Sequence, residues 1–270
     1  MPQSESQNMT NTPGLPRVIA WFSHGACSAV ATKMALERFG DRVVIVTIDP
    51  GREHPDNLRF RFDCERWFDY PIKVLRSERY ADHIDVARKT RYINGPTGAR
   101  CTAELKKAVR HGFERSDDLH VWGYAMNKRD ALRAENFVLN NPGVDSWFPL
   151  IEGGLYKSNC LALIQRAGIE LPTMYALGYT NNNCIGCWKG GKGYWNKIRQ
   201  DFPEVFAEAA KAEREIGHSA INGTFLDELE IGAGRYKAEE VLCDLNCQAI
   251  ESEWTSPEQR KEENDEQTNG

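Results

Sequence analysis

The chain has 270 residues, and its 34 lysines and arginines against 39 aspartates and glutamates give a formal net charge of −5 at pH 7. Hydrophobic residues make up 41% and charged residues 27%, which is ordinary for a globular protein that buries a sizeable core. No apolar run approaches the ~18 residues that a membrane span needs, and the polar N-terminus lacks the apolar core of a signal peptide, so we expect a cytoplasmic protein. The acidic balance argues against a protein that coats nucleic acid.

Strands and helices are predicted to alternate in the first half of the chain. Residues 1–16 are polar and without periodicity, and we expect them to be disordered. Apolar runs typical of strands occur at residues 17–23, 42–49, 72–75 and 119–124, and helices are expected at 29–39, 55–69 and 101–114. Because nearly continuous apolar strands are typical of a parallel sheet covered on both faces, residues 17–150 are predicted to form a Rossmann-like α/β sandwich.

Beyond about residue 150 the strand pattern ends. Helices are predicted at 157–167, at 194–200 and from 203 to about 216, joined by segments rich in glycine and asparagine. We expect residues 151–250 to form a helical, cysteine-bearing extension that is held together by something other than a sheet. Residues 251–270 are acidic and polar, which predicts a disordered tail.

The first strand is followed by a turn of small residues, Ser23-His24-Gly25-Ala26-Cys27-Ser28. Backbone N–H groups converge at such a turn, and the N-terminus of the next helix adds a positive dipole, so phosphate is its natural occupant. We expect the hydroxyls of Ser23 and Ser28 to donate further hydrogen bonds. From the residues alone, the alternative to a phosphate site is a tight turn that only connects the strand to the helix.

This turn and several later motifs resemble a known family. The turn is similar to the PP-loop, Ser-x-Gly-x-x-Ser, of the adenine nucleotide α-hydrolase superfamily, whose Rossmann-like sheet is of the HUP type. Together with the later motifs, over about residues 18–215, it resembles the phage-type branch of the phosphoadenosine phosphosulfate (PAPS) reductase-like proteins. The later motifs are Glu53-His-Pro-Asp-Asn57, Gly98-Ala-Arg-Cys-Thr-Ala-Glu-Leu-Lys-Lys107, Gly123-Tyr124 with Asp130-x-x-Arg133, Asn182-Asn-Cys-Ile-Gly-Cys-Trp-Lys-Gly-Gly191 and Gly193-Tyr-Trp-Asn-Lys-Ile-Arg199.

The resemblance implies an enzyme that binds ATP, PAPS or a related adenylylated sulfate at the loop. Asp49, at the end of the second strand, would hold the ribose or adenine, although it equally suits a turn. Lys106 would contact the anionic end of the substrate; the alternative is that Lys106 belongs to a charged helix face exposed to solvent. Arg133 could bind phosphate or sulfate with two hydrogen bonds. Two reactions fit: reduction by a thiol reductant, with Cys243 as nucleophile, and sulfur transfer from a sulfur donor to an acceptor such as nucleic acid.

The chain also departs from the family pattern. His24 stands where these loops usually carry glycine, and we expect its ring to lean toward the phosphates as an extra donor. Cys27 replaces the usual loop aspartate, and the Glu-Cys-Gly-x-His segment of PAPS reductases is missing, with only Cys243 and Cys247 in a comparable place. These departures favour the rival hypothesis of a non-catalytic nucleotide-binding or host-interaction module with a structural metal site.

The chain has eight cysteines, which in a cytosolic protein are expected to be thiols or metal ligands. Cys184-Ile-Gly-Cys187 presents two thiols from one tight turn, which suits a redox dithiol or half of a tetrahedral metal site. The resemblance makes Cys101 a third ligand, because iron–sulfur relatives carry paired cysteines there. We choose Cys160 as the fourth, since it is polar-flanked at a helix start. A 4Fe–4S cluster is expected, with zinc as the alternative.

Aromatic and basic residues interleave between Trp188 and Arg199. Such a pattern could form a surface for nucleic acid, with rings for stacking and cations for phosphates. Trp195 and Ile198 are at core-facing helical spacing, however, which favours packing over nucleic-acid contact.

Overall fold

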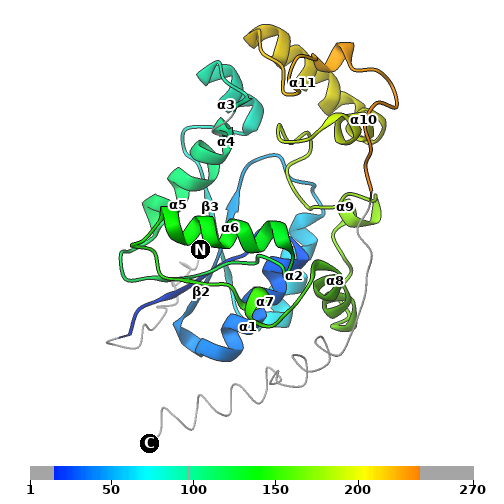
Figure 1. The fold of residues 1–270 in the computed structure, drawn as a ribbon. Coiled ribbons are helices and arrows are strands. Elements are labelled where there is room, and N and C mark those ends of the chain that lie inside the picture. The colour runs from blue at the N-terminus through cyan, green and yellow to red at the C-terminus, as the bar shows by residue number, and fades with distance from the viewer. Residues whose placement is uncertain (1–14, 96–97, 238–270) are drawn as a thin grey trace, which may run out of the picture.

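A computed structural model describes residues 15–95 and 98–237 of the chain (Figure 1). Apart from residues 15 and 16, the segments expected to be disordered lie outside the described residues. So do Cys243 and Cys247, and the expected role of Cys243 as nucleophile therefore stays a prediction from sequence.

A five-stranded parallel sheet lies at the centre of the first half, as predicted. Its strands are ordered β3-β2-β1-β6-β7, which is compatible with a Rossmann-like fold. Val18 of β1 pairs with Val43 of β2 on one side and with Leu119 of β6 on the other. The strands are β1 (Val18–Trp21), β2 (Val43–Asp49), β3 (Ile72–Arg76), β6 (Leu119–Val121) and β7 (Ser146–Trp147).

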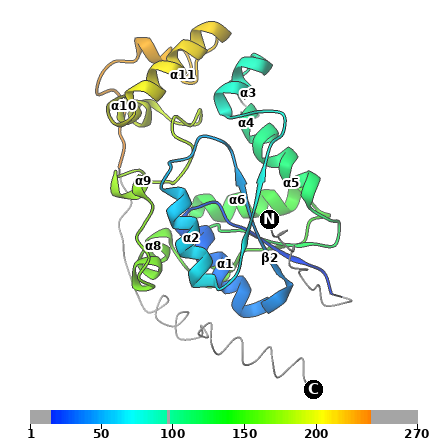
Figure 2. The same ribbon diagram turned by 180° about the vertical axis from the view of Figure 1, so that it is seen from behind.

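Helices cover both faces of this sheet, which is why its central strands are apolar at nearly every position. Val18 and Ala20 point to the face covered by helices α1 and α2, and Ile19 points to the opposite face, where Phe113 of α5 packs. Figures 1 and 2 show the two layers from opposite sides. The helices named here and their neighbours are α1 (Ala26–Phe39), α2 (Asn57–Phe68), α5 (Ala108–Phe113), α6 (Lys128–Asn140), α7 (Pro149–Glu152) and α8 (Lys157–Arg166).

A second apolar core lies beyond the carboxyl ends of the strands. It is formed by α3 (His83–Thr90), α10 (Lys192–Asp201) and α11 (Pro203–Ile216), with Trp188 and Trp195 almost completely buried inside it. Figure 1 shows these helices standing above the sheet. The part of the chain that has few strands is therefore held together by an apolar core of its own.

The expected helix at residues 101–114 is broken into three parts. It consists of α4 (Arg100–Thr102), a π-helical segment η2 (Ala103–Lys107) and α5. Widened turns of this kind occur frequently at functional sites. The remaining elements are η1 (Gly40–Arg42), β4 (Asn94–Gly95), β5 (Gly98–Ala99), α9 (Thr173–Ala176) and η3 (Leu226–Glu228). Of the helices in the described segments, none combines the length and apolar character needed to cross a membrane.

Candidate functional site

The loop between β1 and α1 is held in shape by its own serines. The Ser28 hydroxyl donates to the Gly25 carbonyl at 2.9 Å and accepts from the Ser23 backbone N–H at 3.0 Å. The Ser23 hydroxyl in turn donates to Ser28 Oγ at 3.1 Å. Both hydroxyl protons are thus used within the loop, whereas the sequence led us to expect them as donors to a ligand.

This loop lies where the strand order reverses, between β1 and β6. Open α/β sheets bind their ligands at such a point, outside the carboxyl ends of the strands. The chain leaving β6 presses directly on the loop at Gly123. A Cβ atom there would lie 2.7 Å from Ser28 Cα and 2.8 Å from Ser28 N, so only glycine allows this approach without a shift.

His24 departs from its expected orientation. Its backbone has φ 56°, a left-handed conformation that favours glycine, which explains why glycine is usual at this loop position. Its ring is buried, with Nδ1 2.6 Å from Glu53 Oε2 and Nε2 3.4 Å from Thr47 Oγ1. The expectation that the ring leans toward phosphates is wrong, because these contacts turn it into the interior.

Two asparagines tie the loop to the segment that carries the cysteine turn. Asn182 Nδ2 donates to the His24 carbonyl at 2.6 Å and to Asn57 Oδ1 at 2.8 Å. Asn57 Nδ2 donates to Glu53 Oε2 at 2.9 Å. Neither asparagine was singled out as a site residue from sequence, although both lie within the motifs that carry the family resemblance.

Three of the four expected metal-binding cysteines come together around one cation. Burial lowers the pKa of Lys106, but the neighbouring Cys184, Glu53, Cys187 and Cys101 outweigh it and raise this pKa above its ordinary value. Burial raises the pKa of Cys184 to about 12, with Lys106 opposing the rise. A Lys106 ammonium group among thiols is suited to stabilise a thiolate or another anion.

Glu53 joins this cluster to the loop. Its carboxylate accepts a hydrogen bond from Asn57 and lies against the His24 ring, and its charge also acts on Lys106 and Cys184. The loop after β1 and the thiols therefore belong to one connected site, although they are far apart in sequence.

The Cys184–Cys187 turn is clamped by Tyr194. The Tyr194 hydroxyl accepts from the Cys187 N–H at 2.9 Å and donates to the Cys184 carbonyl at 3.3 Å. Gly186 has φ 72°, and a Cβ atom there would lie 2.8 Å from Val205 Cγ1. Gly186 therefore allows the bend that presents the two cysteines from one turn.

Cys160 lies elsewhere. It is completely buried in the apolar core of the sheet half, at the start of α8, and its charge acts on Tyr175, which contacts the loop at Gly25. The structure therefore does not support Cys160 as the fourth ligand. Among residues 15–95 and 98–237, no three His, Cys, Asp or Glu side chains are already arranged to hold a metal ion. The metal centre stays a prediction.

Asp49 and Arg133 both have protein partners. Burial raises the pKa of Asp49, but hydrogen bonds from Arg76 and from the Gly51 N–H, the latter at 2.7 Å, hold it below the ordinary value. This is the turn role considered as the alternative from sequence. Arg133 is exposed, lies 2.7 Å from Asp130, and stacks over the Tyr124 ring at 4.6 Å.

Several residues of the loop and of the basic stretch have structural roles. Cys27 is half-buried against the core of the sheet half. Trp195 and Ile198 are completely buried, so the core-packing interpretation is confirmed. Trp188 is buried as well, and Arg199 donates to the carbonyls of residues 226 and 229. The buried tryptophan rings are not available to stack on bases.

No family model matches the sequence. The chain is similar to the uncharacterized protein MJ0066 of Methanocaldococcus jannaschii, with 24% identity over 207 residues, which cover 73% of this chain and 42% of that protein. The chain thus spans less than half the length of this relative, and the relative's name assigns no activity.

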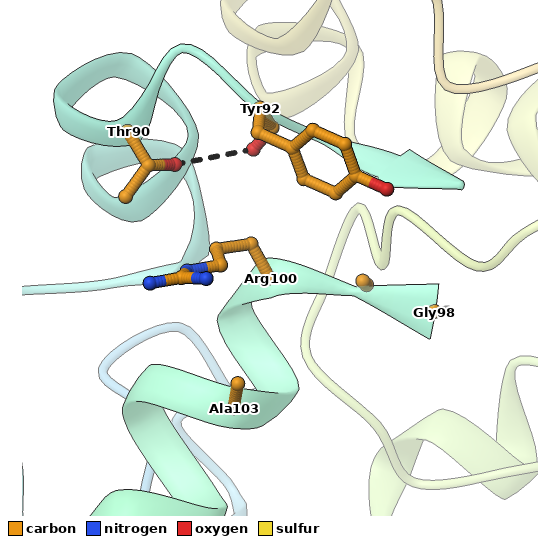
Figure 3. Close-up of a pocket in the computed structure, with 6 residues that line it drawn as sticks. Thr90, Tyr92, Gly98, Arg100 and Ala103 are labelled. Carbon is orange, nitrogen blue, oxygen red and sulfur yellow. Dashed lines mark hydrogen bonds between the residues drawn. The ribbon is translucent and has the colours of Figure 1, made fainter. Parts of the chain in front are cut away.

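The sequence did not predict a pocket that lies close to Cys101. Two of its lining residues, Arg100 and Ala103, are sequence neighbours of Cys101. The pocket has a volume of about 640 Å³ and lies between the C-terminal end of α3 with the segment that follows it and the chain from β5 into α4 and η2 (Figure 3). Arg100 at its edge is paired with Glu104 at 2.6 Å. The pocket is lined by Thr90, Tyr92, Gly98, Ala99, Arg100 and Ala103.

Proposed function

We propose that this protein is an adenine-nucleotide-binding enzyme of the PAPS reductase-like family, with a HUP-type sheet and a cytoplasmic location. It would either reduce an adenylylated sulfate or use ATP for sulfur transfer. One observation carries the proposal: Glu53 contacts the loop residue His24 and also acts on Lys106 in the thiol cluster. A nucleotide whose phosphates lie at the loop would bring its reactive group toward the thiols.

The chain's own residues supply binding and charge. The N–H groups at the start of α1 and the helix dipole would hold phosphate. Lys106 would stabilise the anionic group that leaves or the thiolate that attacks. The exposed Arg133 would reach an outer phosphate after giving up its pairing with Asp130. Bound metal would be held by Cys101, Cys184, Cys187 and a fourth donor, and would supply a soft Lewis-acidic or redox-active centre.

The two reactions differ in what they release. In reduction, the Cys243 thiolate attacks the sulfur of the adenylylated sulfate, the sulfur–oxygen bond to phosphate breaks, and adenosine phosphate leaves. A reductant thiolate then attacks Cys243 Sγ and releases sulfite, leaving a disulfide. In sulfur transfer, ATP adenylylates the acceptor and releases pyrophosphate, and the sulfur of the donor displaces AMP.

A second candidate is a non-catalytic nucleotide-binding module. The observation in its favour is the loop itself, where Cys27 replaces the usual aspartate and both serine hydroxyl protons are used internally. This module would bind nucleotide and release no product.

Calorimetric titration with ATP and with PAPS tests the shared part of the proposal. We expect the wild type to bind one of them, and Ser28→Ala to bind it about tenfold more weakly because the loop loses the hydroxyl that organises it. Ser116→Ala, at an exposed serine, is the matched control and should bind like the wild type. Absence of binding to either nucleotide contradicts the proposal.

Product assays then separate the candidates. Pyrophosphate from ATP indicates sulfur transfer, and adenosine bisphosphate with sulfite from PAPS indicates reduction. Binding without either product favours the module.

A further inference from the structure

A buried histidine lies against the turn that carries two of the thiols. His83 begins α3 and is only 2% exposed. Its ring lies beside the Gly186 carbonyl, between the two cysteines of the turn, but neither ring nitrogen makes a hydrogen bond of normal geometry to a described residue. A buried polar group that is poorly paired is costly, so such a group is a candidate to bind a ligand.

Two contacts with Trp188, the residue after Cys187, fix His83 to the turn. The Trp188 indole N–H donates to the His83 carbonyl at 3.1 Å. The two rings meet edge to face with their centroids 5.6 Å apart. Because backbone and ring are both held by the same residue, the imidazole keeps its place beside the cysteines.

Imidazole is the commonest metal ligand in proteins, and it binds through the electron pair of a ring nitrogen. The His83 side chain is buried, and its nitrogens make no hydrogen bond of normal geometry to a described residue, so a nitrogen is available to bind an ion. The neighbouring Asp82 carboxylate is used elsewhere, because it accepts from the Ile84 and Asp85 N–H groups at 2.8 and 2.9 Å.

We propose that His83 is the fourth donor of a metal site formed with Cys101, Cys184 and Cys187. Three thiolates and one imidazole are a ligand set of structural zinc, whereas 4Fe–4S clusters are held by four thiolates, so this set favours zinc. A zinc ion with three thiolates carries one net negative charge, which the Lys106 ammonium group balances. Since the four side chains are not arranged around a common point in the described structure, the cysteine side chains must turn toward the imidazole when the ion binds.

This inference rests on the thiol cluster of the proposed function, but it does not depend on which nucleotide the loop binds. Metal analysis after anaerobic purification, followed by Co²⁺ titration of metal-free protein, tests it. We expect one zinc per chain in the wild type and a Co²⁺ spectrum of tetrahedral thiolate coordination. His83→Gln should weaken Co²⁺ and Zn²⁺ binding by at least about tenfold, because one ligand is lost.

Three further variants make the test specific. His83→Cys should restore tight binding and shift the Co²⁺ visible bands to longer wavelength, because a fourth thiolate replaces the imidazole. His218→Gln, at an exposed histidine, and Cys160→Ser should both behave like the wild type. Circular dichroism shows whether each variant folds. If His83→Gln does not fold, the shift of the Co²⁺ bands in His83→Cys shows whether residue 83 is a metal ligand.

The proposal is overturned if His83→Gln binds metal like the wild type, if Cys160→Ser loses it, or if no variant binds metal. Nucleotide titration of the wild type is a separate measurement. A negative result for metal binding therefore does not contradict the proposed function, and a failure to bind nucleotide does not contradict the proposed metal site.

Discussion

Glu53 links the loop after β1 to the thiol cluster. Its side chain is 11% exposed, and the carboxylate lies 2.6 Å from His24 Nδ1 and accepts from Asn57 Nδ2 at 2.9 Å. It also supplies one of the negative charges around Lys106. Removing this charge leaves a buried ammonium group less well compensated, and unpaired buried charge is among the costliest defects in a protein.

Glu53→Gln should therefore lower the free energy of unfolding by about 2 kcal/mol, since a glutamine oxygen is a weaker acceptor and its amide faces donors. Urea unfolding followed by circular dichroism measures this. Glu215→Gln is the matched control, because Glu215 is 39% exposed and pairs with Arg88 at the surface. We expect a change of about 0.5 kcal/mol or less there. Equal effects of the two variants would show that Glu53 has no special role.

At the scale of elements, the connection after β6 shapes the loop after β1. Gly123→Ala places a methyl group against the backbone of Ser28, which cannot move aside as a flexible side chain would. Forced shifts of this kind cost about 1–3 kcal/mol. We expect a lower urea midpoint and weaker nucleotide binding by calorimetry. Gly143→Ala, where a methyl group meets nothing within 4 Å, should change neither. If Gly123→Ala binds nucleotide like the wild type, the connection after β6 does not influence nucleotide binding at the loop after β1.

The elements also show what sequence patterns can and cannot predict. The strands β1, β2 and β3 were predicted to within about two residues, because continuous apolar runs bounded by polar turns leave few alternatives. Helices α3 and α6 were missed, although Asp82 and Asn127 cap them with side-chain hydrogen bonds. Both helices are amphipathic and begin at a capping residue, so the sequence carried enough signal to predict them. Strand β7 has two residues, too few to form a pattern.

The motifs that form the site could be predicted from the sequence, whereas the contacts between them could not. The loop, Cys101, Lys106 and the Cys184–Cys187 turn were found from motifs, because their spacing along the chain is short and specific. The inward turn of His24 and the burial of Cys160 depend on packing between segments that are distant in sequence. No local pattern encodes such packing.

At the scale of the whole molecule, two apolar cores meet at the site. The sheet core contains Cys64, and the second core packs beside Cys101. Arg52 connects them, since its carbonyl accepts from the Ile185 N–H at 2.9 Å and its guanidinium lies 2.6 Å from Glu208 of α11. The buried apolar residues of the two cores form separate clusters, so the two cores should open separately, as structural units of unequal stability do.

Trp195→Ala tests this by creating a cavity in the second core, where the ring is completely buried; such changes cost about 3–5 kcal/mol. Under native conditions, N-ethylmaleimide labelling read by mass spectrometry should then reach Cys184 much faster than in the wild type, while Cys64 stays protected. Phe60→Ala, in the sheet core, is the matched variant and should expose Cys64 to labelling while Cys184 stays protected.

If both cysteines are labelled at the same rate in either variant, the molecule opens as one unit. A metal ion or nucleotide bound at the junction would then stabilise the entire fold. If they label separately, a ligand at the thiol cluster stabilises the second core alone.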